Sequence, residues 1–463
     1  MPRLAAELAG LTGRGWLYVD ELARRSSWRH TPVDFVADWR PFLATDAAVG
    51  GVVVASMCRD GRIREAAVQV LSGLRDPVAS AALAVRVADW VPEVAGLART
   101  AVSVRTGPRE AAAIVPVYLA LGKRIRGRQP AARYLADLAE GAAGTLEALA
   151  VDGDRACRLW ALGALKARGL TPADVLAGRA MRDTDPVVAL WCAQALAGPS
   201  GDLPALEGQP LLGSARAGVR AFAAGHLRSG ELPVQALRDL LFDRSAAVRS
   251  VARWRWRQQH GDPRAVYRAA LACPGPAGHV TAALAGLDED HDASLPGAAV
   301  PFLTHPSPRV RRTAAQAVAR HTDPGGTVQL LVPLLSDPSA KVTAAALRYL
   351  RGHALPASVL ADLDAVGSPR SRRIALSIRQ QSGSWPRVCA DLAAMAGADP
   401  DLAEAGRTDV LSWLQHGAAT SYGGPTAAQA EQITALLATP RLSEHQRRDI
   451  AFVAGIPITA APR

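Results

Sequence analysis

A short pattern returns along this chain about every 31 residues: an Asp or Pro turn, followed by an apolar segment rich in alanine. Asp154 and Asp185 open two such segments, and Pro338, Pro369 and Pro400 open three more at the same interval. We find no sustained alternation of polar and apolar residues, the pattern that predicts β-strands. Self-similarity at this period is typical of repeat proteins. We therefore expect an all-α fold, an α-solenoid of stacked helix–turn–helix repeats.

Each unit is too small to be stable alone. A pair of short helices cannot bury its apolar face without a neighbour, so the repeats must stack into a superhelix or arc with a long inner surface. The turn residues support this prediction. Asp is a favoured N-cap, and Pro is tolerated in the first helical turn, where its missing N–H has no intrahelical partner.

The charge balance says little about partners. The chain has 463 residues and a formal net charge of +11, from 53 basic and 42 acidic side chains. Only three of the basic residues are lysines, and asparagine is absent. This bias favours a bacterial genome rich in G and C, which raises the arginine content for reasons unrelated to function. Nucleic acid is thus a candidate partner on weak evidence only.

The sequence shows no sign of a cofactor or metal site. Its five cysteines are far apart, which fits buried free thiols in a reducing cytoplasm. The acidic run at 288–292 hints at a calcium loop, but Ala293 and Ala299 stand where such a loop needs Gly and Glu. We interpret this run as a loop between repeats. No signal peptide or membrane span is expected, since the longest apolar stretch has about ten residues.

The repeated segments carry a recognisable consensus, D-x-x-x-V-R-x-x-A-A-x-A-L. The best copies are "DRSAAVRSVA" at 243–252 and "PSPRVRRTAAQAV" at 306–318. This pattern resembles a HEAT repeat, specifically the short bacterial type of phycobilin-lyase-like proteins. The resemblance covers residues 45–400 and implies the fold. It leaves the function open, because the family includes scaffolds, adaptors, lyases and a branch of DNA glycosylases.

The regularity of the pattern suggests three regions. Residues 1–45 are predicted to form an N-terminal helical cap, because their sequence is poorly periodic. Residues 46–400 form the repeat array, with an irregular insertion near 108–153. Residues 401–463 lose the repeat pattern and are predicted to be a C-terminal helical cap, since the ends of a solenoid need a polar outer face.

Aligning the second helix of each repeat on the Val of Val-Arg, which we call column 0, predicts the core. Columns 0, +4 and +8 lie on one helical face and are almost all apolar. Column +4 is uniformly small, so helices should approach closely there. Its members are Ala67, Ala161, Cys192, Ala223, Ala252, Ala314, Ala346 and Ala375.

Column +1 is rich in arginine: Arg64, Arg158, Arg220, Arg249, Arg311 and Arg372. The family resemblance implies that such an arginine pairs with the turn Asp of a neighbouring repeat. The alternative is a ladder of free cations that binds a ligand. Column +3 holds three successive aromatics, Trp160, Trp191 and Phe222, which either fill the core or form a stacking platform.

Columns +2 and +6 should face the inner groove. From 154 to 227 they hold apolar or small residues, and from 248 to 379 they turn basic, with one aromatic, Trp254. An exposed Trp among arginines suits stacking on a base or gripping an acidic peptide. We predict a binding site made of Trp254, Arg253, Arg255, Arg312, Arg348 and Arg373.

These observations predict a non-enzymatic HEAT-repeat scaffold or adaptor, monomeric and cytoplasmic, whose groove binds a protein partner. Nucleic acid is the second candidate ligand. The alternative is a DNA-binding enzyme resembling the HEAT-type alkylpurine DNA glycosylases. It would need a carboxylate beside a groove aromatic, and the sequence places none there. We expect no catalytic residue, no cofactor and no metal.

Overall fold

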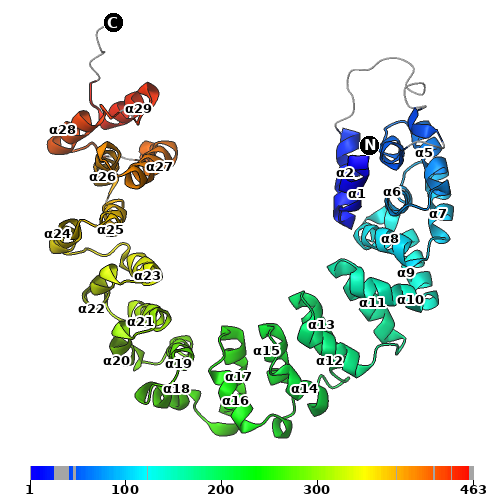
Figure 1. The fold of residues 1–463 in the computed structure, drawn as a ribbon, viewed down its shortest axis with the longest axis horizontal. Coiled ribbons are helices and arrows are strands. Elements are labelled where there is room, and N and C mark those ends of the chain that lie inside the picture. Colours follow the sequence, from blue (N-terminus) through cyan, green and yellow to red (C-terminus); the bar gives the residue numbers. More distant parts are fainter. Residues whose placement is uncertain are drawn as a thin grey trace. The chain divides into compact units, whose positions relative to one another are not determined.

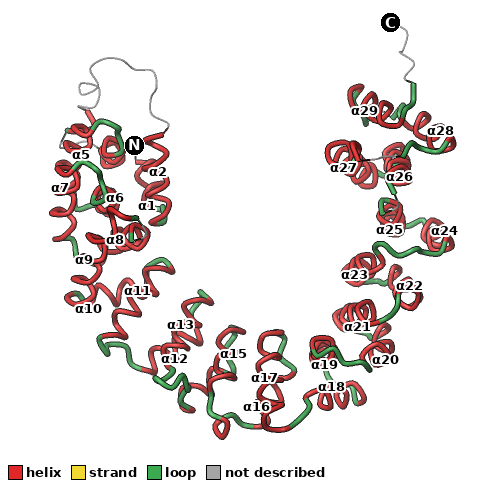
Figure 2. Tube along the Cα trace, turned by 180° about the vertical axis from the view of Figure 1, so that it is seen from behind, coloured by secondary structure: helices red, strands yellow, loops and turns green. Residues whose placement is uncertain are grey.

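A computed structural model describes residues 2–25, 41–44, 48–122, 124–381, 383–420, 423–439 and 441–457. The chain divides into two compact units, Met1–Leu237 and Arg238–Arg463. Helices joined by short loops make up both units (Figure 2). Apart from one parallel bridge between Leu203 and Leu227, the described residues contain no β-structure. The predicted all-α class is confirmed.

The first unit is built almost wholly from helices, most of them paired. They are α1 (Pro2–Ala9), α2 (Gly13–Arg25), α4 (Val49–Ser56), α5 (Gly61–Gly73), α6 (Pro77–Arg86), α7 (Pro92–Ser103), α8 (Pro108–Leu121), α9 (Ile125–Gly141), α10 (Ala143–Asp152), α11 (Arg155–Ala167), α12 (Ala173–Arg182), α13 (Pro186–Leu196), α14 (Ala205–Leu211), α15 (Ala217–His226) and the 3₁₀ turn η1 (Ser229–Glu231). The segment predicted as an irregular insertion is thus helical, in α8, α9 and α10.

Helix α16 (Val234–Leu241) leads into the second unit. The helices that follow are α17 (Ala246–His260), α18 (Pro263–Ala272), α19 (Ala277–Glu289), α20 (Leu295–Ala299), η2 (Val300–Thr304), α21 (Pro308–His321), α22 (Pro324–Leu331), η3 (Val332–Ser336), α23 (Ala340–Leu350), α24 (Ala357–Val366), α25 (Pro369–Arg379), α26 (Ser384–Ala396), α27 (Pro400–His416), η4 (Ala418–Thr420), α28 (Ala427–Leu436) and α29 (Glu444–Ala454). In this unit α17, α19, α21, α23 and α25 follow one another in one row, and α18, α20, α22 and α24 form the other (Figure 1).

Most residues of the predicted core columns are buried as expected; Leu196 and Arg379 of column +8 are only partly buried. All eight residues of column +4, Ala314 among them, are completely shielded from solvent. In column 0, Val248, Val310 and Val342 are likewise shielded. Small side chains let neighbouring helices pack closely, and this close approach increases the apolar contact between the flanking columns. Column-based reasoning therefore located the core of both units.

The turns also follow the predicted chemistry at several repeats. The Asp185 carboxylate accepts a hydrogen bond from the Val187 N–H, and Pro186 occupies the first helical turn of α13. Asp154 caps α11 in the same way. Asp243 differs, because α17 begins only at Ala246 and the Asp243 carboxylate instead accepts from the Ser245 N–H. Most of these turns thus satisfy the backbone donors that a helix start leaves unpaired.

Both predicted caps contain helices. Trp16 of α2 is buried in the core of the first unit, and Trp385 and Trp413 are buried in a separate core formed by α26 to α29 and the loops between them. The predicted limits at residues 45 and 400 stay predictions, while the division at Leu237 falls inside the predicted array. Residues 26–40, 45–47 and 458–463 of the predicted caps lie outside the described residues.

Candidate functional site

Most arginines of column +1 are structural. Arg64 binds Asp89 with 2.9 Å between Nη2 and Oδ1, and Arg158 pairs with Asp183. Arg372 approaches Asp399 at 3.6 Å. In each case the acidic residue lies in a turn one repeat further along the chain. The pairing that the family resemblance implied is therefore confirmed at these positions.

Arg311 shows how such a pair is built. Its Nε and Nη2 donate to the two carboxylate oxygens of Asp337 at 2.6 and 2.8 Å, and its Nη1 donates to the carbonyl of His305 at 2.8 Å. The same carboxylate accepts from the Ser339 N–H at 2.7 Å. Burial acts to raise the pKa of Asp337, but the Arg311 guanidinium and the backbone N–H lower it below its usual value. The arginine thus locks one repeat onto the next turn.

The acidic run 288–292, at the end of α19, is a crosslink between helices. It is bound from both sides, by Arg249, Arg253 and Arg257 of α17 and by Gln316, Arg320 and His321 of α21. The Asp288 carboxylate, for example, accepts from Arg320 at 2.7 Å and from His321 at 2.8 Å. No cluster of metal-ligating side chains occurs in the described parts of the chain. Asp288 and Glu289 form the end of α19, so the interpretation of this run as a loop between repeats holds only for residues 290–292.

Two of the six predicted site residues lie inside the protein. Arg253 and Arg255 are each only 6% exposed. Arg253 binds Glu289 at 2.5 Å and Asp290 at 3.2 Å, and the Arg255 guanidinium lies 5.8 Å from the ring centre of Trp254. Successive residues on a helix point about 100° apart, so the neighbours of an exposed residue turn toward the flanking helices. The expectation that both arginines surround Trp254 at the surface is therefore corrected.

The other four site residues are exposed. Trp254 has half of its surface exposed, on α17. Arg312 of α21 and Arg348 of α23 are exposed and make no ion pair with any described residue. Arg373 of α25 is exposed and makes a 3.4 Å ion pair with Asp401, which is itself largely exposed. Such an exposed pair is weak and is easily exchanged for a ligand.

The stretch 293–361, which contains α20 to α23, has an excess of positive charge that goes beyond the two predicted site residues Arg312 and Arg348. It contains seven basic residues and two acidic ones. Asp337 is held by Arg311, and Asp323 caps α22. Five exposed cations are left without an ion pair to any described residue: Arg309, Arg312, Lys341, Arg348 and Arg351. A charge count over windows of two repeats would have found them.

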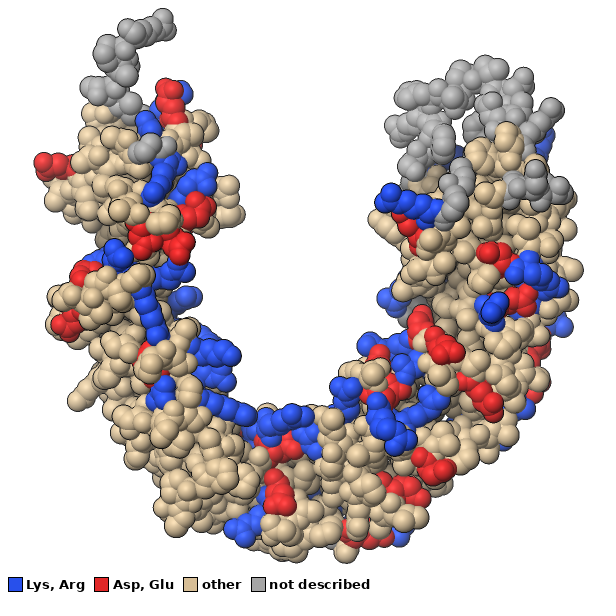
Figure 3. Space-filling view, in the orientation of Figure 1, with Lys and Arg blue, Asp and Glu red and all other residues tan. Residues whose placement is uncertain are grey.

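We call the exposed side of α17, α19, α21, α23 and α25 the second-helix face. No residue in columns +2 and +6 from 248 to 379 is buried, so both columns belong to this face. Basic side chains gather along this side of the second unit (Figure 3). In the first unit the aromatics of column +3, such as Trp160 and Trp191, are instead half-buried against the apolar core. A stacking platform there stays a prediction.

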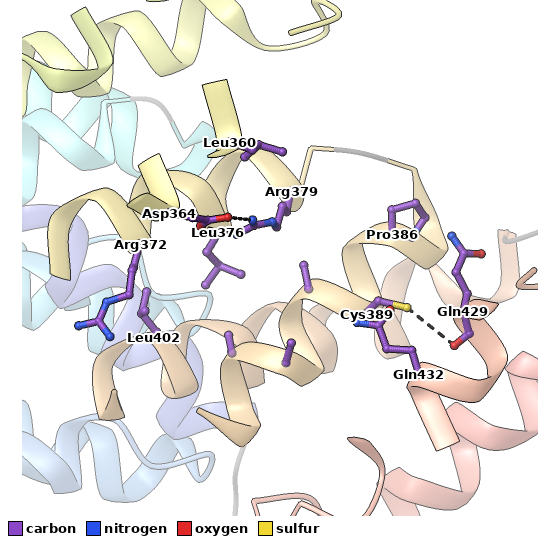
Figure 4. A pocket seen from close by; sticks show the side chains of 13 residues that line it. Leu360, Asp364, Arg372, Leu376, Arg379, Pro386, Cys389, Leu402, Gln429 and Gln432 are labelled. Atoms are coloured by element: carbon purple, nitrogen blue, oxygen red, sulfur yellow. Dashed lines mark hydrogen bonds and ion pairs between the residues drawn. The ribbon is translucent and has the colours of Figure 1, made fainter. Parts of the chain in front are cut away.

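A cleft of about 590 Å³ lies between α25 and the last helices of the chain (Figure 4). Leu360, Leu376 and Leu402 line it, and an Arg379–Asp364 ion pair stands beside them. Cys389, across the cleft, has its thiol 4.0 Å from the Gln429 carbonyl. Burial raises the pKa of this thiol, which makes it a poor nucleophile. The cleft thus offers no reactive thiol, and its wall mixes apolar side chains with charged and amide groups.

Two carboxyl groups meet between α26 and α27. Asp391 is completely buried and accepts a hydrogen bond from the Gln380 Nε2 at 2.7 Å. Asp409 is held by Arg387 through contacts of 2.5 and 2.7 Å. Burial, followed by the neighbouring Asp409 carboxylate, raises the pKa of Asp391 to about 8. At neutral pH Asp391 therefore retains its proton, and the pair carries one negative charge opposite Arg387.

The family comparison agrees with this architecture. Residues 295–377 match the family model for HEAT repeats. This stretch contains α20 to α24 and most of α25. The finer similarity to phycobilin-lyase-like repeats stays a prediction. A search among curated proteins finds no match.

Forty-five solved chains match this one. One of them comes from a structure described with the words "Kap95p Binding Induces the Switch Loops of RanGDP to adopt the GTP-bound Conformation". It shares 11% identity and a TM-score of 0.32 with this chain, and the alignment covers 96% of this chain. The chain spans 66% of that chain's length. Repeats of the HEAT type form extended surfaces suited to protein interaction. No helix in the described part of the chain is both long and apolar enough to span a lipid bilayer.

Proposed function

We propose that this protein is a non-enzymatic interaction scaffold whose second-helix face binds an acidic segment of a partner protein. The observation that carries the proposal is the set of five exposed cations between residues 293 and 361 that have no carboxylate partner among the described residues. Uncompensated like charges repel one another and weaken the folded state. An acidic ligand removes that cost, and Trp254 adds an apolar contact on the same face.

The geometry of the repeats sets the spacing that such a segment needs. Neighbouring packed helices lie about 8–10 Å apart. An extended peptide rises about 3.3 Å per residue. A peptide that crosses α21, α23 and α25 in turn would therefore meet a new helix about every three residues. Arg312, Arg348 and Arg373 supply one exposed cation on each of these helices.

Acidic protein is favoured over nucleic acid because the face offers only one exposed aromatic among its predicted site residues, Trp254. Single-stranded nucleic acid is generally held by several stacking aromatics. The DNA-binding enzyme alternative needs a free carboxylate beside this Trp. Glu289 and Asp290, the acidic residues bound by the Trp254 helix, are both engaged by arginines. The proposal includes a monomer in the cytoplasm, as the sequence predicted.

The test is the double charge reversal Arg312→Glu with Arg348→Glu. Fluorescence anisotropy would measure binding of a labelled ten-residue glutamate peptide and of single- and double-stranded DNA across a salt series. We expect the peptide to bind and the double variant to weaken it at least tenfold, since each reversal turns an attraction into a repulsion.

The matched control is Arg109→Glu with Arg126→Glu, two exposed arginines of the first unit that also have no ion pair with described residues. This variant has the same net charge and should bind the peptide like the wild type. Equal weakening by both variants would mean that only net charge matters. Tight DNA binding with a log–log salt slope of several units would assign the face to nucleic acid instead.

A further inference from the structure

A small cavity in the first unit has the features of a ligand site. Helices α7, α8 and α9 enclose about 290 Å³, close to the lower end of the range for small-molecule pockets. Its wall combines a largely apolar surface with the polar groups of six side chains: Arg99, Thr100, Ser103, Tyr118, Arg133 and Asp137. We call it the α7–α9 cavity. It lies in a different unit from the second-helix face, and the proposed function makes no use of it.

Tyr118 places an unpartnered hydroxyl in this cavity. The side chain is 2% exposed, and its ring packs edge-to-face on Tyr134 with 5.1 Å between the ring centres. The hydroxyl makes no hydrogen bond with any described residue. It is nevertheless not completely enclosed by protein atoms. It therefore opens into the cavity that Tyr118 lines. The Tyr134 hydroxyl, by contrast, donates a hydrogen bond to the Arg105 carbonyl at 2.7 Å.

Two arginines and one carboxylate, Asp137, line the cavity. Arg99 is anchored through its Nε to the Ala95 carbonyl at 3.1 Å, which leaves its two terminal nitrogens for a ligand. Arg133, on α9, is exposed and makes no ion pair with any described residue. The two arginines reach the cavity from different helices, so a single anion placed between them would contact both.

A third cation lies directly behind the wall. Arg105 is 1% exposed and adjoins Thr106, which lines the cavity. Its guanidinium donates to the Ser80 hydroxyl at 2.8 Å and to three backbone carbonyls, and no described carboxylate pairs with it. No carboxylate contacts this buried arginine directly, and the more distant Glu110 offsets only part of its charge. In a low-dielectric interior its field reaches the cavity and favours an anion there.

We propose that the α7–α9 cavity binds a small phosphate monoester that carries hydroxyl groups. The phosphate lies between Arg99 and Arg133 and accepts a hydrogen bond from the Tyr118 hydroxyl. The hydroxyl oxygens of Thr100 and Ser103, which donate to carbonyls of their own helix, accept from the ligand's hydroxyl groups, as does the Asp137 carboxylate. The volume limits the ligand to roughly the size of a triose or tetrose phosphate.

Isothermal titration calorimetry of the full chain tests this, with glycerol 3-phosphate, inorganic phosphate and glycerol as probes. We expect glycerol 3-phosphate to bind at one site, more tightly than phosphate, and glycerol to give no saturable heat. Arg99→Ala with Arg133→Ala should weaken binding at least twentyfold. Tyr118→Phe, which keeps the buried ring, should weaken it about five- to tenfold through the lost hydrogen bond.

The control is Arg109→Ala, which removes an exposed arginine outside the cavity and should leave the affinity within twofold. The proposal is overturned if no probe binds saturably, or if the cavity variants bind as well as the wild type. It is also overturned if Arg109→Ala or the Arg312→Glu, Arg348→Glu variant weakens binding as much as the cavity variants do. The last outcome would show that phosphate follows net charge or the second-helix face.

Discussion

The buried carboxyl group of Asp391 makes the packing of α26 on α27 depend on pH. In the folded protein this carboxyl keeps its proton up to about pH 8, because burial and the neighbouring Asp409 carboxylate disfavour its charged form. In the unfolded chain it loses the proton near its ordinary value of 3.8. Between these two values only the folded state binds the proton. The free energy of unfolding must therefore fall as the pH rises through this window.

The magnitude follows from linkage. One proton gives about 1.4 kcal/mol per pH unit, hence about 2.7 kcal/mol between pH 5 and pH 7. Asp409 does not cancel this effect. Burial acts to raise its pKa, but Arg387 and the neighbouring protonated Asp391 hold the pKa below its ordinary value. Its own titration thus lies below the window. The substitution Asp391→Asn puts a neutral amide where the neutral carboxyl group stands, so it removes the pH dependence of the free energy of unfolding.

Native-state hydrogen exchange of peptides from 384–416 gives the local free energy of opening, after correction for the intrinsic effect of pH on exchange. We expect this free energy to fall by about 2.7 kcal/mol from pH 5 to pH 7 in the wild type and to stay nearly constant in Asp391→Asn. Asp401→Asn, at a highly exposed carboxylate of α27, should keep the wild-type slope. Equal slopes in the wild type and Asp391→Asn would refute the reasoning.

Two further substitutions test the packing between repeats. Arg311→Ala should lower the free energy of unfolding of the second unit by roughly 3–5 kcal/mol, because it leaves the buried Asp337 carboxylate unpaired. The control is Arg309→Ala, at an exposed arginine that makes no ion pair with any described residue, and it should cost less than about 0.5 kcal/mol. Urea unfolding measures both. Gly406→Ala should lower the midpoint of thermal unfolding, because the new Cβ would lie 2.6 Å from a backbone oxygen of α26. Forcing the two helices apart would cost about 1–3 kcal/mol. The control Gly278→Ala, at an open helical position, should leave the midpoint unchanged or raise it. A wild-type midpoint for Gly406→Ala would contradict the close approach.

Sequence periodicity determined the helical class, the repeat and the buried columns of this protein. A position in a repeat fixes which way its side chain points relative to its own helix, so Ala314 was recognisably core and Arg312 recognisably exposed. The pairing of Arg311 was also accessible, because its partner lies one repeat further on, at a spacing that recurs along the chain. These are properties of one repeat and its immediate neighbour.

Only the tertiary structure decided which charges are free. Arg253 is neutralised by Glu289 and Asp290, which lie at the end of α19, 36 and 37 positions away in the chain. The column alignment does not predict this pairing. The protonated Asp391 and the open hydroxyl of Tyr118 likewise depend on what other helices place around them. The free energy of a buried polar group is set by its partners and its exposure, and both arise only when separate helices pack.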